Sequence, residues 1–205
     1  MRVPHLVSLL FIAVALSAGC YESTSIEQSW RSPSAPSGEL TNVVTYADSK
    51  SPSIRRGSED KLAMQLQQRG IHAVPAYAVI PDDMLDDRDR MIPYLRQKGF
   101  DGIVSMRFLG AHEKLVSYPS LYDYWGPGWG YGYYYGGYDV YPQTIVRVSI
   151  SAYSLPTNNL VWSAVSRSVD PDDLDDLIND TTKVAARALQ KEQVVGASRT
   201  LSAQR

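Results

Sequence analysis

The chain has 205 residues and balances 20 lysines and arginines against 22 aspartates and glutamates, which gives a formal net charge of −2. This charge provides no basic field for nucleic acid, so we expect no nucleic-acid partner. Once the amino-terminal signal described below is removed, only His72 and His112 remain, with no cysteine beyond Cys20, so the three or four nitrogen and sulfur ligands of the usual zinc sites are lacking. A site with mixed carboxylate ligands stays open but has no positive support. We therefore expect neither a metal nor another cofactor.

The amino-terminal residues have the composition of an export signal. A positive charge precedes an apolar core, 6–16, which is shorter than the roughly 20 residues of a transmembrane helix. The run LSAGC at 16–20 resembles the lipobox of bacterial lipoproteins, although Ser17 stands where the commonest lipobox has a large aliphatic residue. The resemblance implies a lipoprotein signal peptide at 1–19 and lipid attachment at Cys20, as a diacylglycerol-cysteine carrying palmitate-like acyl chains.

The alternative is an ordinary signal peptide with an incidental cysteine, and the use of cysteine argues against it. A lone thiol forms no internal disulfide and would be exposed to oxidation outside the cytoplasm. Acyl chains, at about 0.8 kcal/mol per buried methylene, would instead anchor Cys20 to a membrane. Tyr21 stands where inner-membrane lipoproteins of enteric bacteria often carry aspartate. The resemblance therefore implies an anchor in the outer membrane, facing the periplasm.

The mature chain divides by composition into three parts. Residues 20–39 are rich in serine and proline and predict a tether with a reach of about 25 Å, although Trp30 suggests a first extended segment that docks on the domain. Residues 40–195 form a single periplasmic domain, and 196–205 are expected to be a disordered tail.

Hydrophobic periodicity and turn residues predict alternating strands and helices in this domain. The expected strands cover 40–46, 71–79, 100–109, 144–153 and 160–169, and the pattern allows one more near Leu115. The expected helices cover 51–70, 81–98 and 171–193. Early alternation implies parallel pairing, and the closing hairpin adds antiparallel strands. We predict an α/β fold of the mixed α+β kind, with a mixed β-sheet and about three helices packed mainly on one face.

The segment 118–141 holds nine of the fourteen tyrosines and two of the four tryptophans, interleaved with glycine. It predicts a long loop between two strands, whose exposed rings suit sugar stacking, a partner groove or the membrane–water boundary. An insertion that binds nothing is an equally weighted alternative. The candidate binding residues are Trp125, Trp129, Tyr131, Tyr133, Tyr134, Tyr135 and Tyr138.

Two acidic clusters, PDDMLDD at 81–87 and PDDLDD at 171–176, invite a calcium or acid–base interpretation. Both lie at expected helix starts, where carboxylates are stabilised by the helix dipole, and neither has the spacing of a calcium loop. We favour helix-start stabilisation.

Other charged residues allow weaker predictions. Arg55 and Glu59, four residues apart, are expected to pair on the surface of the first helix. Arg107, Arg147 and Arg167 fall within expected strands, but the sequence does not say whether they share a face.

No catalytic motif occurs in the sequence. There is no Gly-x-Ser-x-Gly elbow, and neither His72 nor His112 stands in a recognisable serine–histidine–acid setting. The glycines are not followed by the lysine and helix of a phosphate loop. We expect no catalytic residues and no enzyme.

Four short motifs and the tyrosine–glycine segment resemble an uncharacterised family of bacterial envelope lipoproteins. The motifs are SWRSP at 29–33, PSIRR at 52–56, QQRGI at 67–71 and LVWS at 160–163, the last ahead of Pro171. The family has no established activity to transfer. The order of elements is more distantly similar to the periplasmic domains of the curli-export lipoprotein and of the TolB amino-terminal domain, which implies a non-enzymatic accessory role.

Two functions follow from these features. The first is a lipid-anchored accessory or scaffolding lipoprotein that holds an envelope protein through a sheet edge or the aromatic segment. The alternative is a glycan-binding module that contacts peptidoglycan or an exported polysaccharide through the aromatic segment. A periplasmic hydrolase would need a catalytic set that the sequence does not contain.

Overall fold

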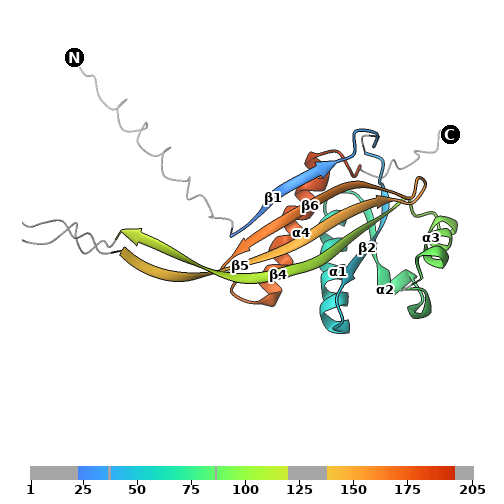
Figure 1. The fold of residues 1–205 in the computed structure, drawn as a ribbon. Coiled ribbons are helices and arrows are strands. Elements are labelled where there is room, and N and C mark those ends of the chain that lie inside the picture. Colours follow the sequence, from blue (N-terminus) through green and yellow to red (C-terminus); the bar gives the residue numbers. More distant parts are fainter. Residues whose placement is uncertain (1–22, 37, 86, 120–137, 197–205) are drawn as a thin grey trace, which may run out of the picture.

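The computed structural model describes residues 23–36, 38–85, 87–119 and 138–196, which form one six-stranded sheet with helices on both sides (Figure 1). The strands are β1 (Thr24–Arg31), β2 (Asn42–Asp48), β3 (His72–Pro75), β4 (Gly102–Pro119), β5 (Tyr138–Ser154) and β6 (Asn159–Val169). The helices are α1 (Pro52–Gln67), α2 (Ala76–Val79), the 3₁₀ helix η1 (Asp82–Met84), α3 (Arg88–Gln97) and α4 (Leu174–Lys191). Among these described residues, no helix has the length and apolar character needed to cross a membrane.

The sheet is mixed, as the sequence predicts, with the strand order β1-β6-β5-β4-β2-β3. Strand β2 pairs in parallel with β3 and with β4, so helical segments make the crossovers between them. Strands β4, β5 and β6 pair antiparallel in sequence, and β1 adds antiparallel to β6. The predicted α+β class is confirmed.

One face of the sheet carries the main core, against α1 and α4. Leu62 and Leu66 of α1 meet Ala185 and Leu189 of α4 over the inward-facing strand residues. Trp162 of β6 is the largest fully buried side chain, and its indole nitrogen donates a 2.9 Å hydrogen bond to the Glu192 carboxylate after α4. The apolar stripe of the last helix, which the sequence shows most clearly, is buried in this core.

In the part of the chain that the structure describes, helices cover the other face only at one corner. There α2, η1 and α3 form a smaller core, centred on Ile92 and Leu95 of α3 with Val44 of β2. Val44 follows Val43, which belongs to the main core, and alternate residues of a strand point to opposite faces. The two long helices therefore lie on one face, and the short helices lie on the other.

Strand β1 lies within the segment that the composition predicts as a tether. Thr24–Arg31 pairs with β6, Ile26 packs against the main core, and the buried Thr24 hydroxyl donates a 2.8 Å hydrogen bond to Ser168. The prediction of a tether is wrong for these residues, because the free edge of β6 pairs with a backbone whose side chains are mostly polar. The other expectation, that a first extended segment containing Trp30 docks on the domain, agrees with this finding.

The strand predicted at 71–79 ends early. Strand β3 stops at Pro75, and Ala76–Val79 form α2. Proline has no N–H for the sheet and fixes a φ suited to the start of a helix, which explains the change of structure. The prediction is wrong for 76–79.

The β4–β5 hairpin projects well beyond the rest of the sheet (Figure 1). On one side β2 accompanies β4 only as far as Arg107, and on the other β6 accompanies β5 only as far as Ile145. Pairing within the hairpin continues to Pro119 and Tyr138. The strand allowed near Leu115 is therefore a continuation of β4.

Candidate functional site

The residues predicted to bind a partner lie mostly outside the described part of the chain. Cys20, the expected lipid attachment site, precedes the first described residue. Tyr138 begins β5, where its backbone pairs with Pro119. The candidates outside the described residues are Trp125, Trp129, Tyr131, Tyr133, Tyr134 and Tyr135.

The hairpin that leads toward this segment carries exposed apolar side chains. Leu115, Val140 and Tyr141 are 70%, 54% and 57% exposed. Leu115 pairs with Pro142, and Val140 lies two residues further along β5 on the same face of the ribbon. Large apolar side chains at the end of a narrow two-stranded ribbon have no core to enter, so they form an exposed apolar surface on the ribbon.

The three strand arginines share one face of the sheet. Arg147 pairs with Arg167 across β5 and β6, and Arg107 pairs with Ser149, two residues from Arg147 along β5. This face lies opposite α1 and α4, and we call it the open face. Ser105, Ser149, Ser151 and Ser163 also lie on this face, across β4, β5 and β6.

Acidic partners neutralise two of these arginines. The Arg107 guanidinium lies 2.7 Å from the Asp48 carboxylate, and Arg147 makes two hydrogen bonds, of 2.7 and 2.9 Å, to Glu27. The hydrogen bond from Arg147 lowers the pKa of Glu27, and the same bond raises the pKa of Arg147. The open face is therefore rich in charge while its local balance is close to neutral.

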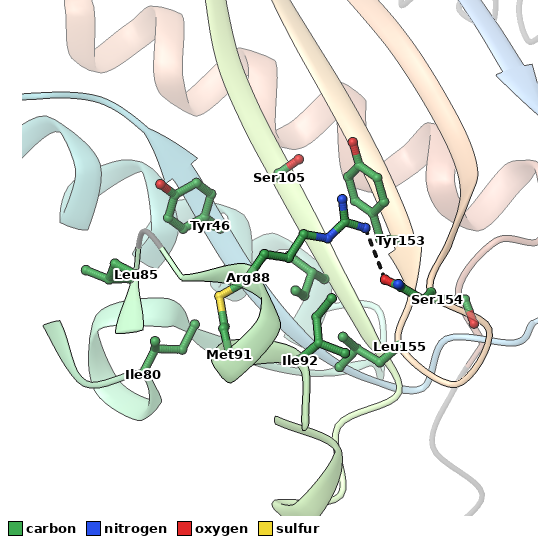
Figure 2. A pocket seen from close by; sticks show the side chains of 12 residues that line it. Tyr46, Ile80, Leu85, Arg88, Met91, Ile92, Ser105, Tyr153, Ser154 and Leu155 are labelled. Atoms are coloured by element: carbon green, nitrogen blue, oxygen red, sulfur yellow. Dashed lines mark hydrogen bonds between the residues drawn. The ribbon is translucent and has the colours of Figure 1, made fainter. Parts of the chain in front are cut away.

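Two adjoining cavities lie on the open face, the first between the sheet and α3 and the second over β2, β4 and β5. The first, of about 220 Å³, is lined mainly by apolar residues, and the second, of about 190 Å³, is lined mainly by polar residues. Tyr46, Ser105 and Tyr153 line both, so the two form one groove, which we call the tyrosine groove. Figure 2 shows Tyr46 and Tyr153 on either side of Ser105.

Arg88, the first residue of α3, closes the apolar end of this groove. Its guanidinium points toward Tyr153 in Figure 2 and lies 5.8 Å from the centre of the Tyr153 ring. It also donates a 3.1 Å hydrogen bond to the Asn158 side chain. The sequence alone does not reveal this site, because its residues come from four separate elements, β2, α3, β4 and β5, which only the fold brings together. The sequence feature that could have indicated the groove is the alternation of serines with apolar residues along the strands, as at Ser149 and Ser151 of β5.

A third cavity, of about 320 Å³, lies on the other side of the sheet at the base of the hairpin. It is apolar and opens between the first turns of α1 and α4, with exposed Phe108 and Leu174 among its lining residues. It extends the exposed apolar surface from the hairpin onto the helical side.

The two acidic clusters lie at helix starts, as predicted. Asp87 caps α3 by accepting a hydrogen bond from the backbone N–H of Arg90, and Asp173 caps α4 by accepting one from Asp176. The nearby Asp173 carboxylate raises the pKa of Asp176. Within the described residues, no group of three or more histidine, cysteine, aspartate or glutamate side chains is placed to hold a metal ion.

The prediction that Glu59 pairs with Arg55 on the surface of α1 is wrong, because Glu59 is buried. Only 1% of Glu59 is exposed, and its carboxylate accepts hydrogen bonds from the backbone N–H groups of Ala47 (3.3 Å) and Tyr77 (3.1 Å). Burial raises the pKa of this carboxyl group. The side chain joins α1 to β2 and α2, a structural role that its helical spacing does not reveal.

No family model matches the chain, and no curated protein matches it in sequence. Among solved structures it is similar to the PelC dodecamer from Paraburkholderia phytofirmans, at 15% identity and a TM-score of 0.47, covering 83% of this chain and 97% of that one. It is also similar to lipoprotein GNA1162 from Neisseria meningitidis (13%, TM-score 0.41, 74% and 99% covered) and to a minor lipoprotein from Acinetobacter baumannii (8%, 0.33, 75% and 94%). All three likenesses lie below 25% sequence identity and below a TM-score of 0.5.

Proposed function

We propose that the protein is a non-enzymatic accessory lipoprotein of the bacterial envelope, anchored in the outer membrane through Cys20, that holds a protein partner with its β4–β5 hairpin. The observation that carries the proposal is the free-standing end of this hairpin. From the Glu113–Thr144 pair outward, no other described strand accompanies it.

The chemistry of this end favours a partner. An isolated two-stranded hairpin is marginally stable in water, and here Leu115, Val140 and Tyr141 are exposed on it. A partner that covered these side chains would remove apolar surface from water, and unpaired edges of the ribbon could accept a further strand. Both effects stabilise a complex without any new catalytic group.

The position of the first described residues supports contact close to the membrane. Ser23 precedes β1, and Thr24 is aligned through Ser168 of β6 with Val146 of β5, at the end of the sheet from which the hairpin projects. Cys20 lies three residues before Ser23, a span of at most about 10 Å in an extended chain. A lipid anchor at Cys20 would therefore hold the hairpin end of the domain near the bilayer.

The test is crosslinking and pull-down of the full-length lipidated protein from cells. We expect a discrete protein partner with the natural chain, and its loss in the double variant Leu115→Ser and Val140→Ser. The matched control is Lys114→Ser with Gln143→Ser, a facing pair on the opposite side of the same ribbon. Recovery of cell-wall or polysaccharide fragments without a protein, or equal loss in both variants, would contradict the proposal.

A further inference from the structure

The tyrosine groove has the construction of a ligand site, and the accessory function does not require it. We propose that it binds one N-acetylated sugar ring of an envelope glycan. The aromatic walls and the polar half would hold the ring and its hydroxyl groups, and the apolar half would hold the acetyl group. The site lies on the open face, apart from the hairpin that carries the proposed protein contact.

The walls of the groove are two tyrosine rings with a small residue between them. Tyr46 on β2 pairs with Ser105 on β4, and Tyr153 on β5 pairs with the neighbouring Ile103. Strands β2 and β5 flank β4, so they lie about 9 to 10 Å apart. This width admits a flat ring above the serine, where a larger side chain would fill the space. Sugar rings have apolar faces that pack on tyrosine, and their polar edges remain free for hydrogen bonds.

The polar half of the groove offers donors and acceptors with little net charge. Arg107 and Asp48 form an ion pair there, and the Ser149 and Ser151 side chains also line it. Sugar hydroxyl groups both donate and accept hydrogen bonds, which suits a guanidinium beside a carboxylate. A phosphate or a strongly anionic ligand would meet Asp48 at the same place, so a neutral ligand fits better.

The apolar half begins on the other side of the tyrosines. Ile80, Leu85, Met91 and Ile92 line it, with Arg88 at its edge. An acetamido group combines a methyl group, which would enter this apolar space, with a carbonyl that accepts a hydrogen bond. The Arg88 guanidinium is the donor at this edge, and its contact with Tyr153 places it beside the ring site.

The row of residues across the sheet gives the groove a direction. Tyr46, Ser105, Ser151, Ser163 and Trp30 are successive partners on β2, β4, β5, β6 and β1. Trp30, 50% exposed, ends this row about 19 Å from Tyr46, four strand spacings away. A polymer could therefore continue along serines to a second aromatic platform. An extended peptide would instead seek an unpaired strand edge, and the groove lies on paired strands.

The test compares two soluble probes on the full-length lipidated protein in detergent micelles. Chitotetraose carries acetamido groups, and cellotetraose is the same kind of chain without them. We expect saturation-transfer NMR and calorimetry to detect chitotetraose with at least tenfold tighter binding than cellotetraose. Equal binding of both probes would overturn the acetyl assignment, and absence of binding by both would overturn the site.

Substitutions of residues that line the tyrosine groove test whether chitotetraose binds there. Tyr153→Leu removes one stacking face and should weaken chitotetraose binding about tenfold. Ser105→Leu fills the floor of the groove and should abolish binding, while Ser105→Ala should retain most of it. Tyr141→Leu, an exposed tyrosine on the hairpin, is the matched control and should bind normally. Loss of binding in the control or persistence in Ser105→Leu would refute the assignment.

The source of the glycan and the independence of the hairpin need separate measurements. Sedimentation with purified peptidoglycan sacculi should succeed if the ligand is the cell wall, and chitotetraose binding without sacculus binding would indicate an exported polysaccharide. Either result supports the site. The hairpin variant with Leu115→Ser and Val140→Ser should keep chitotetraose binding, so loss of the protein partner and loss of glycan binding can be told apart.

Discussion

The two faces of the sheet differ in what they do for the protein, although the same strands build both. On the helical face, Trp162 is fully buried between the strands and α4. On the open face, the neighbouring Ser163 pairs with Trp30, a tryptophan whose side chain is half exposed. One tryptophan packs the main core and the other meets solvent, so the residues proposed for binding lie apart from the main core.

This separation explains how a small domain can carry exposed aromatic and apolar groups. The described core of α1, α4 and the inward strand residues is continuous, and it does not depend on the tyrosine groove or on the outer hairpin. Substitutions of exposed residues on the open face are therefore expected to leave the main core intact. Comparing a buried residue with an exposed residue close to it tests whether the open face contributes to stability.

The largest expected effect is on the helical face. Replacement of Trp162 by alanine removes a fully buried indole and its hydrogen bond to Glu192, and should reduce the free energy of unfolding by about 3–5 kcal/mol. Urea unfolding of the natural and variant chains measures this change.

Trp30→Ala is the matched control, because Trp30 lies on the adjacent strand and on the opposite face. It should change the free energy of unfolding by about 0.5 kcal/mol or less, as surface substitutions usually do. Comparable losses in the two variants would show that the open face is covered in the folded protein and would remove the contrast between the faces.

A smaller loss in the free energy of unfolding is expected from replacement of Glu59, the buried carboxylate of α1 that binds β2 and α2. Glu59→Ala leaves the backbone N–H groups of Ala47 and Tyr77 without their acceptor and should destabilise the protein by about 2–4 kcal/mol. Asp60→Ala, on the next and more exposed position, is the control and should cost less. Thermal unfolding of the two variants distinguishes them.

Glu59 also predicts a pH dependence. Burial raises its pKa above the ordinary value of 4.5, so the folded protein holds the proton over a pH range in which the unfolded chain has released it. The contribution of this group to stability is full below 4.5 and is lost as the pH rises through the raised pKa. Glu59→Gln should lack this decline, and unfolding midpoints measured from acid to neutral pH would test it. An identical decline in the variant would assign it to other groups.

Much of the fold follows from local patterns in the sequence. The alternating residues of β6, the turn before it and the apolar stripe of α4 predict these elements close to their observed bounds. The prediction for β5 is right only for its inner part, because the strand begins at Tyr138, within the segment predicted as a loop. These elements form where local preference and burial agree. The acidic clusters at 81–87 and 171–176 also predict helix starts, but the helix expected from Pro81 is divided into η1 and α3, with Asp87 capping α3.

The missed features depend on contacts between distant segments. Strand β1 forms because β6 offers an edge, and Glu59 is buried because β2 and α2 lie over α1. The tyrosine groove needs the register of β2, β4 and β5 together with the position of α3. No single segment of the sequence contains the register of three strands and the position of a helix. The candidate binding residues are therefore assigned to the aromatic segment at 118–141, whose composition is unusual by itself.

The smallest expected effect concerns the ion pair of Glu27 and Arg147 on the open face. The hydrogen bond from Arg147 lowers the pKa of Glu27, so the pair contributes stability above the ordinary value of 4.5, and this is lost as the pH falls through the lowered pKa. Solvent and salt screen an exposed pair, so the gain in stability is slight, and the pKa is the more sensitive measure.

Arg147→Gln should therefore raise the pKa of Glu27 toward 4.5 in an NMR titration of the carboxyl carbon. Arg107→Gln, which breaks the neighbouring pair with Asp48, is the control and should leave Glu27 unchanged. If the pKa of Glu27 stays low without Arg147, the other cationic side chains near it, Arg167 and then His112, hold the carboxylate instead. That result would mean that the arginines of the open face act as one positive cluster, and the neutral ligand inferred for the adjoining groove would then have to compete with anions.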